Sequence, residues 1–455
     1  MREVTLAEML EARDSRAEAQ RRLLAQTGSP LLSFTMNIPG PVKDSMLIRR
    51  GFDAGLDTLK GALAAAGIAL LSPAEKRAAT GCEFLCAVDA NAEIVKALCL
   101  EIEDTSPMGR LFDMDVIGLD GQKLSRAEER PCLVCGAAGR GCASRRAHSL
   151  EELNAAVTGM LRDGLLESDA ARIGALATKA LLDEVDTTPK PGLVDRNNNG
   201  SHTDMTRETF YTSAQALRDY WPDCFRIGAE TAHEPPETAF AALRARGVEA
   251  EKSMLAATVG VNTHKGAIFT LGAVCGAIGR LWQPSAPCRG PERIAQECAA
   301  LCTQAVEADF AMVEAQGLPH SAGERLFLQT GQRGVRGELA EGLPAVLHTG
   351  LPALEAGLAD GLSRNDAGVY ALLYLIARGE DSNMVKRGGL TLARETASAL
   401  RRRLRQEPRP SLTEVEDLDR RFIRYGLSPG GCADLLAVSF FLHDWKQTEK
   451  VQDFT

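Results

Sequence analysis

The sequence predicts a two-domain protein, in which an N-terminal α+β domain with a mixed sheet precedes an all-α helical bundle. Three observations lead to this prediction. The 455 residues can form two or three domains with proper cores. Apolar segments typical of strands occur before about residue 120, whereas helical periodicity dominates after about residue 168. We therefore expect domains at residues 1–167 and 168–455.

Composition narrows the class of protein. The chain is 45% hydrophobic and 25% charged, which is typical of a soluble globular protein. A net charge of −9 argues against nucleic-acid binding. The first thirty residues lack the apolar core of a signal peptide, and the apolar runs are too short to span a membrane. Twelve cysteines without a secreted-scaffold pattern indicate a reducing environment. We expect a cytoplasmic protein without a membrane partner.

The N-terminal domain should alternate helices and strands. Its expected helices are 1–30, 46–66 and 91–101, and its expected strands are 31–38, 83–88 and 110–117. After the first strand, Pro39-Gly40-Pro41 forms a rigid loop that ends near the cation Lys43. This loop is either an ordinary turn or part of a binding site.

The strand 110–117 carries Asp113 and Asp115 among apolar residues. Residues two apart on a strand share a face, so these carboxylates lie about 7 Å apart at the backbone. Burying two like charges is costly unless a metal ion or a basic group compensates them. The pair suits Mg²⁺ and phosphoryl or nucleotidyl transfer. A D-x-D pattern alone is a weak signal, and its apolar context favours function.

Four metal-ligating residues follow in the pattern C-x2-C-x6-C-x5-H. They are Cys132, Cys135, Cys142 and His148. This set is acceptable for a structural Zn²⁺ ion. Two alternatives stay open: free buried thiols, or a phosphate site made by the neighbouring Arg140, Arg145 and Arg146.

The motifs NIPGPVK, GRLFDMDV, SR and RPCLVC–C–RRAHS occur in this order and cover most of the first 165 residues. Together they resemble the phosphoribosyl-dephospho-CoA transferase that loads the acyl carrier (gamma) subunit of citrate lyase. The resemblance implies a nucleotidyltransferase-like fold and attack by a carrier serine on the α-phosphate of triphosphoribosyl-dephospho-CoA, with loss of pyrophosphate. Asp113 and Asp115 would then hold Mg²⁺, and Lys43 and Arg110 would bind the triphosphate.

The domain boundary is expected between a helix near 150 and the next helix. Asp163-Gly164 and Ser168-Asp169 are the best breaks, and Ser168 or Asp169 should cap the second helix. The helices expected beyond this point are 171–186, 205–220, 236–259, 264–280, 291–316, 338–358, 366–378, 391–405, 411–425 and 432–446.

The stretch 188–205 is a polar loop between two of these helices. Pro189 and Pro191 exclude a helix. None of the ten residues from Asp195 to Asp204 is apolar. The loop is either a solvated connector or a ligand-binding loop, and its stiffness and two carboxylates favour the second.

Further polar motifs lie at other helix ends. Asn262 or Thr263 should cap a helix whose buried first turn contains Lys265, which makes an anion site. His264 is equally explained as a structural or a ligand-binding histidine. Between glycines, Arg333 and Arg336 could wrap a polyphosphate.

Three other features complete this set of motifs. Glu338 could hold a metal, act as a base or orient an arginine, and a salt-bridged surface loop is the alternative for the whole 331–338 segment. Residues 380–383 and 387–389 form another polar loop. Asp434, in the first turn of the last helix, either balances the helix dipole or faces the same pocket as Asp195 and Asp204. Because all these motifs lie at helix ends, we expect one pocket at one end of the bundle.

The motifs EVDTTPKPGLVDRNNNGSHTDM, GVNTHKGAIFTLG, GVRGE, ED-S-N…RGG and GG-ADLLA resemble triphosphoribosyl-dephospho-CoA synthase over nearly all of 168–446. The resemblance implies that ATP and 3'-dephospho-CoA are the substrates, that a ribose 2'-hydroxyl attacks C1 of the ATP ribose, and that adenine leaves. Cys432 departs from the family pattern, where a serine is expected. Our hypotheses for this reaction are that Asp195, Asp204 and Asp434 serve Mg²⁺ or the attacking hydroxyl, and that Asp195 and Glu338 are catalytic. Lys190, Lys265, Arg333 and Arg336 would bind phosphates, and His264 would contribute to substrate binding.

The two halves would then catalyse consecutive steps of prosthetic-group synthesis and attachment. Three alternatives remain: the malonate decarboxylase carrier as acceptor, a nucleoside glycosylase-like reaction, and an N-terminal module that only binds the carrier. Oligomeric state, the number of metal ions, the general base and channelling between domains are not predicted.

Overall fold

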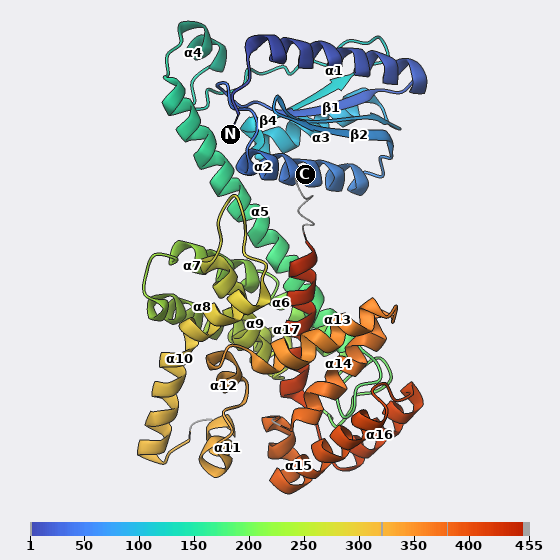
Figure 1. The fold of residues 1–455 in the computed structure, drawn as a ribbon, viewed down its shortest axis with the longest axis vertical. Helices are drawn as coiled ribbons and strands as arrows, with labels where there is room; N and C mark the ends of the chain where they lie inside the picture. The colour runs from blue at the N-terminus through green and yellow to red at the C-terminus, as the bar shows by residue number, and fades with distance from the viewer. Residues whose placement is uncertain (1, 320–321, 380, 449–455) are drawn as a thin grey trace. The chain divides into compact units, whose positions relative to one another are not determined.

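The computed structural model describes residues 2–319, 322–379 and 381–448. It separates into two compact units. The N-terminal unit contains Met1–Asp169 with Pro284–Ala286, and the C-terminal unit contains Ala170–Gln283 with Pro287–Thr455. The first is α+β and the second is helical, as the sequence predicts (Figure 1). In the described residues, no helix has both the length and the apolar character that crossing a membrane requires.

The N-terminal unit contains a four-stranded sheet in the order β2-β3-β1-β4. All three pairings are antiparallel, so the predicted mixed sheet is wrong in this respect. The strands are β1 Leu31–Met36, β2 Leu70–Ala78, β3 Gly81–Val88 and β4 Phe112–Ile117. The helices are α1 Leu6–Thr27, α2 Met46–Ala65, α3 Ala92–Thr105 and α4 Gly139–Arg145, with the 3-10 turn η1 Gly109–Leu111.

The sheet has one apolar and one polar face. On the apolar face Phe34 stacks on Phe52 of α2, with ring centroids 4.8 Å apart, and meets Phe112 of β4 edge-on. The opposite face is covered by α1, from which Arg16 pairs with Glu83 at 3.0 Å. Figure 1 shows α1 on one side of the sheet and α2 with α3 on the other. Because side chains alternate between the two faces of a strand, Glu83 of β3 and Asp113 and Asp115 of β4 lie on the face that α1 covers.

The strand β2 was not predicted. It lies at the edge of the sheet and its residues are mostly exposed, so it lacks the alternation by which half-buried strands are recognised. Pro73 lies between Leu71 and Ala74, where the register shifts in a β-bulge. Proline is tolerated there because an edge strand with a bulge needs no donor at that position.

The predicted break between residues 163 and 169 is wrong, because α5 runs without interruption over Leu150–Asp186. Ser168 and Asp169 therefore cap no helix. Asp169 instead forms a buried ion pair with Arg50 at 2.7 Å. Gly164 is required for packing, since a Cβ there would come within 2.1 Å of Met108 Cγ. The residues that predicted a helix break therefore lie inside a continuous helix, where Gly164 and Asp169 make tertiary contacts.

The C-terminal unit is a bundle around α9 Lys265–Arg280, whose residues from Ala267 to Gly279 are almost all buried. This confirms the predicted central helix. Its main packing partners are α7, α8, α10 and α17. The other helices are α6 Arg207–Ala216, α7 Tyr220–Glu230, α8 Pro236–Ala257, α10 Pro291–Gln316, α11 Ala322–Thr330, α12 Gly334–Ala340, α13 Leu351–Ala359, α14 Arg364–Arg378, α15 Ser382–Gln406, α16 Leu412–Arg424 and α17 Gly430–Gln447.

Three helix boundaries differ from the expectation. The predicted helix 205–220 is divided into α6 and α7, and the predicted helix 338–358 is divided into α12, the π-helical turn η2 Val346–Gly350 and α13. The polar segment 382–388 is helical rather than a loop, and α15 is kinked at Gly389, where φ is 80°. Glu380 of the same predicted loop lies outside the described residues.

Candidate active sites

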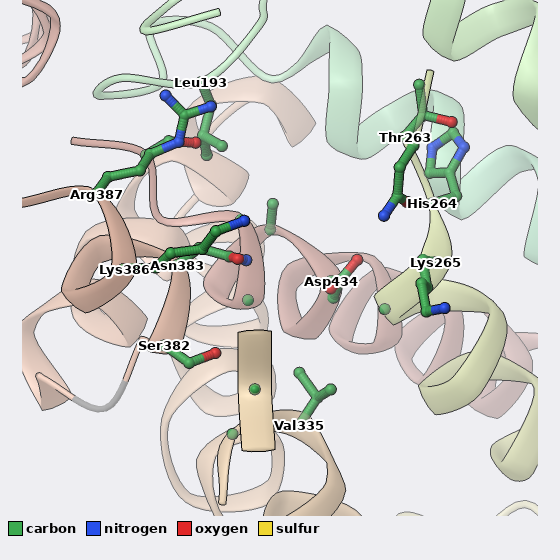
Figure 2. A pocket seen from close by; sticks show the side chains of 18 of the residues that line it. Leu193, Thr263, His264, Lys265, Val335, Ser382, Asn383, Lys386, Arg387 and Asp434 are labelled. Carbon is green, nitrogen blue, oxygen red and sulfur yellow. The ribbon is translucent and has the colours of Figure 1, made fainter. Parts of the chain in front are cut away.

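A cavity of about 640 Å³ lies in the C-terminal unit where several helix ends converge. The loop 188–205 and the starts of α9, α12, α15 and α17 contribute to its wall, and Figure 2 shows their side chains around one space. The polar motifs are thus brought together as expected for one pocket. The charged lining residues are Glu184, Lys190, Asp204, Lys265, Glu324, Arg333, Arg336, Lys386, Arg387 and Asp434.

Asp195 organises the loop rather than the cavity wall. The residue is 3% exposed, and its carboxylate accepts the N–H groups of Lys190 at 2.9 Å, Asn197 at 2.7 Å and Asn198 at 3.0 Å. It is not among the described residues that line the cavity. The catalytic and metal-binding roles predicted for Asp195 remain predictions, and the geometry favours a positioning role.

A second carboxylate ties this loop to α16. Asp419 accepts the N–H of Gly192 at 2.8 Å and the side-chain amide of Asn198 at 2.9 Å. Burial raises the pKa of Asp419. Gly192 has φ 72°, and a Cβ there would come within 2.2 Å of the Leu427 carbonyl oxygen. The loop is therefore held against α16 by the hydrogen bonds of Asp419, and the close approach to Leu427 requires glycine at position 192.

Lys190, predicted to bind phosphate, is almost fully buried. Its ammonium donates to Glu184 Oε1 at 2.6 Å and to the Glu184 carbonyl oxygen at 2.7 Å. Glu184 itself is 5% exposed. A buried lysine must be paired because an isolated charge is costly to desolvate. Two of the three ammonium donors are therefore used by Glu184, and the pair forms part of the cavity wall.

His264 lines the cavity as a neutral imidazole. Burial, aided by the charge of Lys190, lowers the pKa of His264 to about 3. Its Nδ1 is 2.6 Å from Ser213 Oγ, which also accepts the hydroxyl of Thr263 at 2.7 Å. The Ser213 hydrogen is then left for Nδ1, so the ring proton lies on Nε2. Within the described part of the chain, Nε2 is buried and has no hydrogen-bond partner.

The start of α9 differs from the prediction in two ways. Neither Asn262 nor Thr263 caps the helix: His264 is the N-cap residue and makes no side-chain cap bond. Lys265 is not buried, because its side chain is 57% exposed and pairs with Glu251 at 2.7 Å. It still lines the cavity, where Figure 2 shows it near His264.

Asp434 projects from α17 toward this helix start. A Cβ on Gly266 would come within 1.9 Å of Asp434 Oδ2, so glycine is required for the carboxylate to approach. Burial first, and then the negative charges of Glu184 and Asp381, raise the pKa of Asp434 well above its usual range. A carboxyl group with these properties is suited to proton transfer or to binding a cation.

The predicted binding and catalytic residues of segment 331–338 line two neighbouring cavities. Arg333 lies over the Phe310 ring, 5.3 Å from the centroid, and Arg336 is 3.4 Å from Glu324. Both arginines line the main cavity. Glu338 instead accepts the Ala345 N–H and lines a second cavity of about 250 Å³.

The second cavity shares Gln332, Arg333, Gly334, Val335, Ser382 and Gly431 with the first. Cys432, which departs from the family pattern, also lines it, and its N–H donates to Asp381 at 2.8 Å. Burial raises the pKa of Cys432 well above its usual range, so a neutral thiol stands where a hydroxyl was expected.

Sequence reasoning missed several lining residues of the main cavity. Glu184 was hidden within a helical pattern, Arg387 was assigned to a loop, and Lys386 was not considered. Arg387 donates to the Ser201 carbonyl oxygen at 3.0 Å and to His202 Nδ1 at 3.2 Å. His202 therefore donates from Nε2 to Ser428 Oγ at 2.8 Å. Burial and the charge of Arg387 lower the pKa of His202.

The N-terminal unit has its own cavity, of about 510 Å³, beside the polar face of the sheet. It brings together the predicted residues Lys43, Arg110 and Asp113. Burial lowers the pKa of Lys43, and burial together with the charge of Arg130 lowers the pKa of Arg110. The sequence did not identify four further charged lining residues, which are Arg13, Arg16, Glu83 and Arg130.

The two predicted carboxylates of β4 share a face but differ in their surroundings. Asp113 lies opposite Thr35 and Asp115 lies opposite Ser33 in the β1–β4 register, which confirms the predicted face. The Thr35 hydroxyl is 3.5 Å from Asp113 Oδ2. Asp115 pairs with Lys123 and is not among the described residues lining the cavity.

The predicted Cys/His set also comes together. The ligand atoms of Cys132, Cys135, Cys142 and His148 all lie within 4.8 Å of one another. No other such group of three or more cysteine, histidine or acidic residues occurs in the part of the chain that the structure describes.

Each unit thus presents a cation-rich cavity that contains a carboxylate, an arrangement typical of enzymes that act on phosphorylated substrates. Comparison with known families agrees and defines two transferase domains. Residues 170–453 match the family ATP:dephospho-CoA triphosphoribosyl transferase (CitG), and residues 4–164 match apo-citrate lyase phosphoribosyl-dephospho-CoA transferase (CitX). The chain belongs to the family of CitXG proteins, in which both domains occur in one chain.

Individual relatives support this membership. The chain is 33% identical to protein CitXG of Haemophilus influenzae over 452 residues, which cover 96% of each protein. It is 31% identical to protein CitXG of Leuconostoc mesenteroides over 468 residues, covering 96% of this chain and 97% of the relative. A probable 2-(5''-triphosphoribosyl)-3'-dephosphocoenzyme-A synthase of Vibrio cholerae is 41% identical over 286 residues, covering 62% of this chain and 90% of the relative.

Proposed function

We propose that the C-terminal unit joins ATP to 3'-dephospho-CoA with release of adenine, and that the N-terminal unit transfers the product to a serine of the citrate lyase acyl carrier protein with release of pyrophosphate. The domains assigned to these steps are residues 168–455 and 1–167. The observation that carries the proposal is the convergence of the separate polar motifs of the C-terminal unit on one cavity of about 640 Å³. Its lysines and arginines suit the phosphates of the two substrates.

In the synthase step, Asp434 accepts the proton of the attacking ribose 2'-hydroxyl. Its raised pKa supports this role, because a carboxylate with a raised pKa binds a proton more strongly. Lys190 is less suited to be the main phosphate ligand, since Glu184 already occupies two of its donors. Phosphate binding is assigned to the less buried cations of the cavity, which are Lys265, Arg333, Arg336, Lys386 and Arg387.

His264 contributes a neutral donor. Its Nε2–H is buried, is without a partner in the described residues and belongs to a residue of the cavity wall. A buried donor without a hydrogen-bond acceptor costs free energy. We therefore expect an acceptor atom of the substrate to bind the His264 Nε2–H. Adenine carries several ring-nitrogen acceptors, and a donor to one of them would stabilise the leaving base.

Mg²⁺ fits both cavities. This ion is usually bound by one or two carboxylates together with substrate phosphates, so a preformed cage of three acids is not needed. Asp204 is available in the C-terminal cavity, where Asp434 serves as the base, and Asp113 is available in the N-terminal cavity. When bound, the ion would neutralise phosphate charge. Asp115 could join Asp113 only after leaving Lys123, and Asp195 only after leaving its loop donors.

In the transferase step, a carrier serine attacks the α-phosphate. Arg13, Arg16, Lys43, Arg110 and Arg130 surround the cavity and would hold the triphosphate. The sheet with an acidic residue beside this basic cavity supports a nucleotidyltransferase-like assignment. We further propose a cytoplasmic location, because none of the twelve cysteines forms a disulfide.

Mass spectrometry of the protein with ATP, Mg²⁺ and 3'-dephospho-CoA tests both steps. Free adenine and a triphosphoribosyl adduct are expected, followed by a mass gain on added apo carrier and release of pyrophosphate. Parallel reactions with citrate lyase and malonate decarboxylase carriers identify the acceptor. Adenine without a CoA-linked product would instead indicate a glycosylase, and an adduct that loads neither carrier would contradict the transferase assignment.

A further inference from the structure

The segment after β4 has little regular structure to hold it. Between Ile117 and Gly139 the chain forms neither a helix nor a strand, and its strand-like pairing within the described residues is limited to two isolated bridges, Ile117–Lys123 and Pro131–Ala138. Ion pairs of Arg126 and Arg130 with Glu103 add to these bridges. A loop of this length in a compact domain is uncommon unless it is functional or is fixed by another constraint. The Cys/His set lies at the end of this segment.

The set has the geometry of a metal site. Cys132 and Cys135 lie in one tight turn, in which Gly136 N–H donates to the Cys132 carbonyl oxygen at 3.2 Å. Cys142 of α4 brings its Sγ to 3.5 Å from that of Cys135.

The fourth member is His148, which follows α4. Its Nε2 is buried and has no hydrogen-bond partner in the described chain. A tetrahedral Zn²⁺ with bonds near 2.0–2.3 Å requires ligand atoms roughly 3.3–3.8 Å apart. The four atoms, all within 4.8 Å of one another, need only small shifts to reach this spacing. A disulfide between Cys135 and Cys142 would leave the histidine nitrogen and the third sulfur unexplained.

The turn that holds Cys132 also contacts two arginines of the N-terminal cavity. Arg110 Nε donates to the Pro131 carbonyl oxygen, and the Arg130 carbonyl oxygen accepts the Gly139 N–H at 3.1 Å. The Arg130 side chain donates to the Phe112 carbonyl oxygen at 2.6 Å and pairs with Glu103 at 2.8 Å. Both arginines line the cavity, so their positions depend on the turn.

We infer that Cys132, Cys135, Cys142 and His148 bind one Zn²⁺ ion, and that this ion fixes the turn which positions Arg110 and Arg130 for the triphosphate. The metal site stands on its own geometry, whereas the positioning role rests on the proposed transferase function. The ion is structural, because all four coordination positions are supplied by the chain. Carrier loading therefore depends on the metal, and adenine release does not.

Metal analysis of the full chain tests the site. One zinc per chain is expected, and replacement by Co²⁺ should give the visible absorption bands of a tetrahedral thiolate site. Cys135→Ser should lose both signals, and Cys288→Ser, a half-buried cysteine of the C-terminal unit, should keep them. A wild-type chain that takes up neither zinc nor Co²⁺ would overturn the site.

Reversible removal of zinc by a chelator tests the positioning role without a mutation. Loading is measured with preformed triphosphoribosyl-dephospho-CoA, and its KM is expected to rise at least tenfold and to recover when zinc is restored. Adenine release should stay within twofold. Trp221, Trp282 and Trp445, the three tryptophans of the chain, all lie in the C-terminal unit, so an unchanged fluorescence midpoint shows that this unit is intact.

The outcomes separate the two claims. Zinc binding with unchanged loading after its removal would overturn the positioning role. Equal loss of both activities would overturn it as well, since the effect would then not be specific to the N-terminal cavity. A protein that binds zinc but loads neither carrier would overturn the transferase assignment and support the metal site.

Discussion

The two cavities hold similar charges in different ways. In the C-terminal unit the important groups are fixed by buried partners: Lys190 by Glu184, and His264 by Ser213. In the N-terminal unit, cations from α1, from the turn η1 and from two loops surround a sheet face. Lys43 and Arg110 contact only backbone oxygens in the described hydrogen-bond network. The first cavity is organised by buried pairs of side chains. The second combines the ion pairs Arg16–Glu83 and Arg130–Glu103 with cations that are held by loop backbone oxygens.

This difference matches the proposed substrates. A site that binds two small molecules and transfers between them benefits from groups fixed before binding. A site that must also accept a serine on a protein needs an accessible cavity, and sheet-edge loops provide one. The comparison predicts that carboxylate substitutions separate the two activities and that arginine substitutions change mainly substrate affinity.

The largest expected effect is that of Asp434→Asn. Loss of the proton acceptor should lower the rate of adenine release by about 10²–10⁴-fold, the usual contribution of a general base. Loading from preformed triphosphoribosyl-dephospho-CoA should be unchanged. Chromatography of free adenine measures the first rate, and Asp219→Asn, whose side chain is 91% exposed, is the control. Equal activity of the two variants would remove Asp434 from the mechanism.

The reciprocal variant is Asp113→Asn. It should lower carrier loading by roughly a hundredfold, because a metal ligand in such a site contributes several kcal/mol of charge stabilisation. Adenine release should not change. Mass spectrometry of the carrier measures loading, and the exposed Asp14→Asn is the matched control. If the Asp113→Asn protein loads the carrier at the normal rate, Asp113 is not the metal ligand, and Glu83 is the next candidate.

A smaller effect is expected when cations are removed. Arg333→Ala should raise the KM of the synthase step and Arg130→Ala that of the transferase step, each by about ten- to a hundredfold, since a hydrogen bond to a charged group contributes about 1.5–3 kcal/mol. Lysine at either position should restore only part of the affinity because it lacks the planar fork. A drop in kcat at unchanged KM would contradict simple phosphate binding.

The smallest effect concerns stability. His264 has a folded-state pKa of about 3, below its ordinary value, so the unfolded chain takes up a proton first as the pH falls. The stability that it contributes is therefore present above pH 6.5 and is lost as the pH falls toward 3. Between pH 6 and pH 5 this loss should be roughly 1 kcal/mol. Denaturant unfolding followed by tryptophan fluorescence should show a weaker loss in His264→Gln, and identical pH slopes would contradict it.

Much of the fold was predictable where periodicity is strong. The helix around 265–280 was identified because it is apolar on all sides, and Asp113 and Asp115 were placed on one face by the period of a strand. The predictions that failed concern features that depend on tertiary contacts. Gly164 suggests a break, yet it is a packing position against Met108, and the edge strand β2 lacks a buried face.

The site was predictable as a location but not in its details. Polar motifs at helix ends indicated one pocket, and the structure brings most of them to one cavity. Which carboxylate faces the cavity could not be predicted from the sequence, because it depends on the partners that Asp195, in a polar loop, and Asp434, near the start of α17, meet in the fold. Glu184 gave no signal, since its role depends on Lys190 reaching back to it across the start of the loop.

The continuous helix α5 has a practical consequence for dissecting this protein. Because the division between the units falls inside it, any fragment that begins at residue 168 starts within a helix and exposes the buried side chains of Ala170, Ile173 and Ala177 at a frayed end. No exposed linker offers a protease a natural cut between Leu150 and Asp186. Point variants of the intact chain, rather than separated halves, are therefore the sound way to assign the two activities.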